Sequence, residues 1–199
     1  MNERGTRRLS LAISEGDGIS VLVEVVDPQA AVAAEEQGAD GIVVRKAGEA
    51  SLRDATDLPI LWCPGGPEAA DAVGADACLL VAGAYGDDWE RLADDHERGL
   101  ALGLDSIVEV HDEEELQATL EHVDPEIFLL GGESPDPDAP SIDHVLELLP
   151  DVPAGKLAVA DLPDATHDEV EALERAGVDA VVVNASDVRE LVGAEPPQV

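Results

Sequence analysis

Basic residues are scarce in this sequence. The 199 residues include 11 lysines and arginines against 45 aspartates and glutamates, which gives a formal net charge of −34. Lys46 and Lys156 are the only lysines. Nucleic acids and anionic membrane surfaces are bound mainly through lysine and arginine side chains. The composition therefore excludes both kinds of partner.

Aromatic residues, cysteines and long apolar runs are scarce as well. Aromatic residues make up 2% of the chain, and no apolar run approaches the ~18 residues that a membrane span needs. Residues 1–8 are basic and polar without an apolar segment behind them, so we expect no signal peptide and a cytoplasmic protein. Cys63 and Cys78 offer neither a disulfide framework nor metal-ligand spacing.

The acidity has a physical interpretation. An apolar content of 45% is enough for a sizeable core, so the charge does not indicate disorder. Acidic excess with few lysines and mainly Ala, Val, Leu and Ile in the core is typical of halophilic proteins. At 1 M salt the Debye length falls to ~3 Å, which screens self-repulsion. Because the acids are spread along the whole chain, we prefer this interpretation to an acidic patch for a basic partner.

A short sequence unit recurs four times. In each copy an Ala-, Glu- and Leu-rich stretch is followed by Gly, one further residue, Asp and an apolar run. The glycine is a helix stop signal, and the apolar run is typical of a strand buried on both faces. The units begin at Gly38, Gly74, Gly103 and Gly177. Four further apolar runs, at 20–26, 58–62, 127–130 and 157–159, bring the predicted strands to eight.

Helical segments alternate with these strands. We predict them at 28–37, 50–55, 67–73, 87–102, 112–121, 141–149, 166–176 and 187–191. Eight strands, each followed by a helix, predict a single (β/α)8 TIM barrel with short loops, because a chain of about 200 residues is at the lower size limit of that fold. A doubly wound open sheet is the rival architecture. The expected organisation is an N-terminal extension with a short helix at 1–19, the barrel at 20–194 and a frayed tail at 195–199.

In such barrels the active site lies at the C-terminal ends of the strands. Glu24 and Glu109 interrupt otherwise aliphatic strands, which favours a functional role over a core role. Cys63 and His111 have simpler interpretations. Cys63 is a small hydrophobic residue, and His111 caps a helix or lies in solvent. The other histidines, at 96, 122, 144 and 167, are predicted on helical surfaces. The remaining strand-end candidates are Arg45, Lys46, Tyr85, Glu133, Asp161 and Asn184.

One part of the chain resembles a known family. Residues 75–81 and 102–116, which include Glu-Val-His-Asp-Glu-Glu-Glu-Leu from Glu109, resemble strands four and five of indole-3-glycerol-phosphate synthase. The likeness extends more weakly to 9–13, 20–25, 57–61 and 172–183. It implies a barrel preceded by an extra helix. It also implies an enzyme without a cofactor that closes an indole ring on carboxyphenylamino-deoxyribulose phosphate, losing carbon dioxide and water.

The resemblance implies catalytic roles for Glu24 and Glu109, but other family positions are substituted. The two lysines that act as general acids in the family fall on Val26 and Cys63. The Asn-x-Arg after strand six becomes Gly131-Gly132-Glu133. The phosphate-binding strand ends, Ser-Glu-Ser-Gly and Gly-Glu-Ser in the family, become Ala160-Asp161-Leu162-Pro163 and Asn184-Ala185-Ser186. A phosphate site needs free backbone N–H groups and positive potential, and these substitutions remove both.

Three functional hypotheses follow. The first is a non-catalytic binding or regulatory barrel, with a small molecule at its mouth and tryptophan-pathway proteins as partners. The second is an active synthase in which Lys46 replaces the lost acids. Its substrate would contact Arg45, Cys63, His111, Glu133, Asp161, Asn184 and Ser186. The third is a different enzyme that uses Cys63 as a nucleophile or holds a divalent cation, although no metal motif is present. The candidate ligands of that cation are Glu24, Glu109, His111, Glu133 and Asp161. We expect either a pair of Arg45 with Glu24 or a bound metal ion to neutralise these carboxylates, and we favour the arginine.

Overall fold

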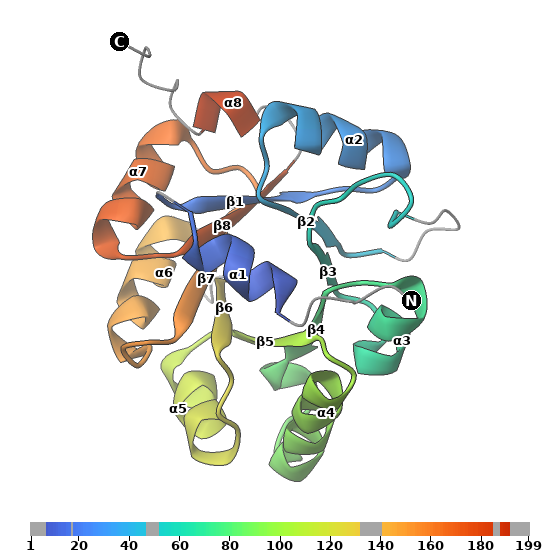
Figure 1. The fold of residues 1–199 in the computed structure, drawn as a ribbon. Coiled ribbons are helices and arrows are strands. Elements are labelled where there is room, and N and C mark those ends of the chain that lie inside the picture. The colour runs from blue at the N-terminus through green and yellow to red at the C-terminus, as the bar shows by residue number, and fades with distance from the viewer. Residues whose placement is uncertain (1–6, 17, 47–51, 132–140, 185–187, 192–199) are drawn as a thin grey trace.

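The protein is a closed barrel of eight parallel strands surrounded by helices (Figure 1). The computed structural model describes residues 7–16, 18–46, 52–131, 141–184 and 188–191. The strands are β1 (Ser20–Glu24), β2 (Gly41–Val44), β3 (Ile60–Trp62), β4 (Ala77–Val81), β5 (Asp105–Val110), β6 (Ile127–Gly131), β7 (Leu157–Asp161) and β8 (Ala180–Asn184). The helices are α1 (Arg8–Ser14), α2 (Pro28–Gln37), α3 (Gly66–Val73), α4 (Trp89–Ala101), α5 (Glu113–His122), α6 (Ser141–Leu148), α7 (His167–Ala176) and α8 (Val188–Leu191), with short 3₁₀ helices η1 (Ala82–Ala84) and η2 (Leu149–Asp151).

The strands follow one another around the barrel in sequence order. Each strand pairs in parallel with the next, and β1 pairs with β8 to close the ring. This closure confirms the predicted TIM barrel and rules out the open doubly wound sheet. None of the helices in the described ranges is long and apolar enough to cross a membrane.

The repeated Gly-x-Asp unit has a structural explanation. Three of its glycines, Gly38, Gly74 and Gly177, end helices with φ values of 90°, 74° and 97°, a conformation in which other residues are strained. The aspartate that follows then accepts a backbone N–H at the start of the preceding strand. Asp40 binds Val21 N, Asp76 binds Ile60 N and Asp179 binds Ala158 N, at 2.8, 3.0 and 2.7 Å.

The fourth aspartate of the repeat holds the N-terminal helix. Asp105 is buried and accepts the backbone N–H groups of Leu9 and Ser10, each at 3.0 Å, and the Ser10 hydroxyl at 2.9 Å. Figure 1 shows α1 lying across one end of the barrel. Because Asp105 begins β5, this is the N-terminal end of the strands. Leu9 and Ile13 of α1 join the apolar cluster inside the barrel.

The helix predicted at 50–55 is wrong. Residues 50 and 51 lie outside the described residues, and 52–55 form a turn closed by a hydrogen bond from Ala55 N to Leu52 O. Arg53 holds this connection in place, because its guanidinium donates to Asp76 and to the carbonyls of Thr56 and Leu58. One contact with a distant carboxylate and two with nearby irregular backbone override a weak helical pattern. The predicted tail at 195–199 also lies outside the described residues.

A candidate active site at the barrel mouth

Strand periodicity determines which side chains reach the mouth. Successive residues of a strand point to opposite faces. Leu22, Val43, Leu61, Ile107 and Val159 belong to the cluster inside the barrel. The residues two positions further along face the same interior at the C-terminal end. They are Glu24, Arg45, Cys63, Glu109 and Asp161. One layer of polar residues therefore lies above the apolar interior, as the sequence predicts.

Arg45 joins two strands across this layer. Its Nε donates to Glu24 Oε2 at 3.1 Å, and its terminal nitrogen donates to both Asp161 oxygens at 2.7 Å. The predicted pair of Arg45 with Glu24 is confirmed. Asp161 is the better buried partner, with 9% of its side chain exposed against 24% for Glu24. The guanidinium is therefore occupied by the protein's own carboxylates on two sides.

His111 forms a second bridge at the mouth. Its Nε2 lies 3.2 Å from Glu109 Oε1, and its Nδ1 lies 3.1 Å from Glu115 Oε2. Glu115 also accepts the backbone N–H of His111, and the carbonyl of His111 accepts Nε2–H of His144 at 2.6 Å. Asp112 caps α5, so His111 is not the helix cap that the sequence suggested. Its side chain instead bridges two carboxylates.

The mouth carries more negative than positive charge. Glu24, Glu109 and Asp161 share one permanent cation, Arg45. Burial raises the pKa of Asp161, and Arg45 opposes that rise. Burial likewise raises the pKa of Glu109 against the opposing charge of His111. An anionic ligand would thus meet carboxylates that are already costly to ionise.

We expect Glu109→Gln to raise thermal stability at neutral pH by on the order of a few degrees. A carboxyl whose pKa is higher in the folded state costs stability once it is ionised. The stability of the native protein therefore falls as pH rises from the unfolded pKa of about 4.3 through the raised folded value. Glutamine resembles the protonated acid and removes that cost.

In thermal melts the gain in melting temperature should fade toward pH 4. Glu97→Gln, on the exposed surface of α4, is the control, and a gain that is constant with pH would contradict this assignment.

Cys63 lies among these charges, but the thiol is not activated. Burial raises its pKa to about 12, with Arg45 opposing and Glu109, Asp161 and Glu24 adding to the rise. A nucleophilic cysteine needs a depressed pKa. The environment of Cys63 therefore favours the inert interpretation over the nucleophile of the third hypothesis.

Lys46 follows Arg45 but does not join the cluster. It is exposed, and among the described residues it forms no ion pair with the carboxylates of the mouth. The structure thus places Arg45, not Lys46, at the centre of the mouth. The described residues also contain no group of three or more His, Cys, Asp or Glu side chains arranged to hold a metal ion.

The loop after β7 has few backbone donors left for a phosphate. Leu162 N donates to Val182 O, Ala165 N to Leu162 O and Thr166 N to Glu169 Oε2, at 3.1, 3.1 and 2.7 Å. Pro163 has no N–H. Asp164 is the remaining residue of this stretch, and its carboxylate accepts Asn184 Nδ2 at 3.4 Å. Four of the five positions from 162 to 166 therefore offer no free amide.

The backbone of Gly131 lies close against Asp161, and only glycine leaves room for this contact. Its φ is 145°, and a Cβ added there would lie 2.7 Å from Asp161 Cβ. The resemblance places the family's asparagine at this position. A side chain at residue 131 would collide with the Cβ and the backbone of Asp161 in this conformation.

Of the remaining site candidates, two lie in the described residues and two do not. Asn184 ends β8 and is exposed, and Tyr85 donates to Asp95 on α4 at 3.0 Å. Glu133 and Ser186 lie outside the described residues.

His96, predicted on a helical surface, is instead buried and lies 2.9 Å from Ser106 Oγ. Glu115 is not among the site residues predicted from the sequence, although a carboxylate four residues after His111 at the start of a helix is a recognisable signal.

The closed parallel barrel and its polar strand-end layer define a TIM barrel with a candidate site at the end where active sites of this fold lie. The model of the indole-3-glycerol phosphate synthase family matches residues 68–190. Indole-3-glycerol phosphate synthase of Shouchella clausii is 30% identical over 185 residues, which cover 85% of this chain and 72% of that protein. The chain belongs to the indole-3-glycerol phosphate synthase family, which confirms the resemblance in sequence.

Other relatives match shorter parts. The synthase of Variovorax paradoxus is 38% identical over 122 residues, 59% of this chain and 43% of that protein. Among solved structures, N-acetylmannosamine-6-phosphate 2-epimerase from Clostridium perfringens superposes with a TM-score of 0.70 at 14% identity, covering 95% of both chains. Thiamine phosphate pyrophosphorylase from Pyrococcus furiosus gives 0.65 at 18%, covering 87% of this chain and 93% of that one. These two structures are similar in fold alone.

Proposed function

We propose that this chain is a non-catalytic member of its family that retains the barrel as a binding or regulatory module. The observation that carries the proposal is the Arg45 bridge. The only permanent cation in the polar layer of the described mouth is held by Glu24 and Asp161 at 3.1 and 2.7 Å. It is therefore not available to neutralise the carboxylate or the phosphate of the family's substrate.

The loss of general acids points the same way. Val26 and Cys63 occupy the positions that the resemblance assigns to lysines. Val26 is 70% exposed, and neither side chain can supply a proton near neutral pH, since burial raises the pKa of Cys63 to about 12. General acid catalysis contributes roughly 10²- to 10⁴-fold for each group. The glutamates alone cannot replace that contribution.

The proposed role rests on binding. Ancestry in tryptophan biosynthesis makes other proteins of that pathway the proposed partners. A molecule at the mouth would be neutral or cationic, because the surplus carboxylates repel anions. At 4 Å and an effective dielectric constant of 20, one like-charge contact costs about 4 kcal/mol. The cytoplasm is the proposed location.

We expect the purified protein in molar KCl to form no indole-glycerol phosphate from the family's substrate. The rate should lie at least about 10⁴-fold below that of the Shouchella clausii synthase, because two general acids are missing. Indole fluorescence measures the product, and circular dichroism in the same buffer confirms that the chain is folded. The protein should also fail to rescue a tryptophan auxotroph that lacks the synthase.

Activity within about tenfold of the Shouchella clausii enzyme would contradict the proposal. The Lys46→Gln variant then distinguishes the second hypothesis. If that activity disappears in this variant, Lys46 is the replacement acid and the chain is a working synthase.

A further inference from the structure

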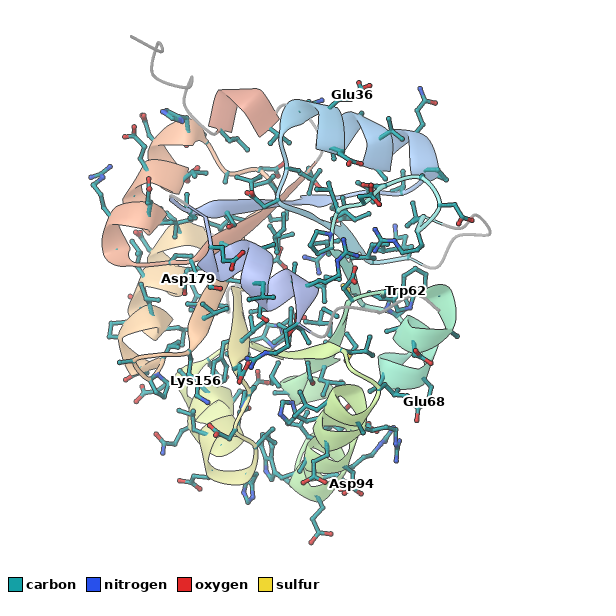
Figure 2. The ribbon with its side chains drawn as sticks, in the orientation of Figure 1. Glu36, Trp62, Glu68, Asp94, Lys156 and Asp179 are labelled. Carbon is teal, nitrogen blue, oxygen red and sulfur yellow. The ribbon has the colours of Figure 1, made fainter. Side chains whose placement is uncertain are left out.

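A pocket of about 330 Å³ lies at the N-terminal end of the barrel, opposite the mouth. It is bounded by the end of α4 and by the starts of β5, β6 and β7. Figure 2 shows Lys156, which lines this pocket, at the end of the barrel that α1 crosses. Ligand sites span about 300–1,000 Å³, so the size suits a small molecule.

The inner part of the pocket combines apolar and polar groups. Leu100, which is 53% exposed, supplies most of the apolar surface, and the buried Leu104 and Ile127 lie in the wall beside it. His96 is buried, with Nδ1 bonded to Ser106 Oγ at 2.9 Å. Among the described residues its other ring nitrogen has no hydrogen-bond partner. Burial lowers the pKa of His96, so the ring is neutral at pH 7 and can bond to a ligand.

The rim carries two cations and two anions arranged in pairs. Lys156 Nζ lies 2.5 Å from Asp124 Oδ1, and Arg7 pairs with Glu126. Asp124 is 89% exposed, and Arg7 and Glu126 are each more than half exposed. The Arg7–Glu126 pair is of the exposed kind that contributes roughly 0–1 kcal/mol. Lys156 is 18% exposed, but its partner Asp124 is accessible to solvent, so a ligand can exchange partners with both pairs. Asp105, the other acidic residue of the pocket wall, already accepts three hydrogen bonds from α1.

We propose that this pocket binds a small zwitterion with an apolar side chain, an apolar α-amino acid. The ligand carboxylate would take the place of Asp124 or Glu126 beside Lys156 and Arg7, and its ammonium group would pair with the acids so released. Its side chain would cover Leu100, Leu104 and Ile127. A phosphate fits less well, because it would leave Asp124 and Glu126 without partners, and a lone cation would do the same to Lys156 and Arg7.

The scarcity of lysine gives a direct test. Labelling the full chain with ¹⁵N-lysine yields two backbone amide signals, from Lys46 and Lys156, which Lys46→Gln and Lys156→Gln assign. L-leucine and L-phenylalanine are titrated separately in the buffer in which the protein is folded. We expect at least one of them to shift the Lys156 signal to saturation and to leave the Lys46 signal in place. Lys46→Gln is the matched control, because it removes the same charge at the opposite end of the barrel.

The chemistry of the ligand is tested with blocked amino acids. L-leucinamide lacks the carboxylate and N-acetyl-L-leucine lacks the ammonium group, so each should bind at least about tenfold more weakly than leucine. Lys156→Gln, followed by calorimetry, should weaken binding by a similar factor, whereas Lys46→Gln should not. Failure of both amino acids to shift the Lys156 signal would overturn the proposal. Equal binding of the blocked compounds, or equal shifts of both lysine signals, would overturn it as well.

Discussion

Replacing Arg45 by methionine should lower the free energy of unfolding by about 3 kcal/mol. The substitution removes the partner of Asp161, whose side chain is 9% exposed, and one partner of Glu24. A buried carboxylate without its cation either remains charged at high cost or takes up a proton. The loss should therefore be larger at pH 8 than at pH 5, because burial raises the pKa of Asp161 and, without Arg45, its carboxyl takes up a proton more readily at the lower pH. Denaturant unfolding at both pH values measures it.

Two further variants make this result specific. Arg175→Met removes an arginine that is 72% exposed and should change stability by no more than about 0.5 kcal/mol. Arg45→Met combined with Asp161→Leu removes both charges of the closest pair and should recover part of the loss. If Arg45→Met behaves like Arg175→Met, the bridge does not hold the mouth as described.

The melting temperature should rise by roughly 10 °C or more between dilute buffer and molar KCl. A net charge of −34 on 199 residues produces strong self-repulsion, and salt shortens the Debye length from about 8 Å at 0.15 M to about 3 Å at 1 M. For a chain of this size, each kcal/mol of stability moves the midpoint by about 2–4 °C. Circular dichroism melts across a KCl series measure the shift.

Sucrose at matched osmolality is the control for the salt series. It stabilises by exclusion from the protein surface and does not screen charge, so it should produce a smaller rise. A midpoint that stays flat or falls as KCl increases would contradict the halophilic interpretation of the composition.

Local patterns predicted the barrel well. Gly38, Gly74 and Gly177 end helices because the left-handed conformation favours glycine, and this signal is independent of the rest of the fold. Strand periodicity correctly brought Glu24, Glu109 and Asp161 to one end, because parallel strands in a barrel share a direction. The turn at 52–55 could not be predicted, since it depends on the contact of Arg53 with Asp76 from another unit.

Contacts between residues far apart in the sequence could not be predicted from local patterns. Asp161 lies 116 residues from Arg45 in sequence, and their contact depends on the closure of β8 against β1. His96 was misplaced for a similar reason. Its helix, α4, is strongly charged, but His96 occupies the stripe that faces β5 and Ser106. In the loop after β7, the Leu162 amide also depends on tertiary geometry, because it donates to Val182 of β8.

We expect the barrel mouth no longer to accept the family's phosphorylated substrate. Calorimetric titration of the folded protein in molar KCl with an indole-glycerol-phosphate analogue tests it most directly, with the Shouchella clausii synthase in the same buffer as a positive control. We predict no saturable heat for this protein, because Arg45 is held by Glu24 and Asp161 and four of the five positions from 162 to 166 in the loop after β7 offer no free amide. Micromolar affinity that Glu109→Gln abolishes would contradict the account and would show that the barrel mouth is still the family's substrate site.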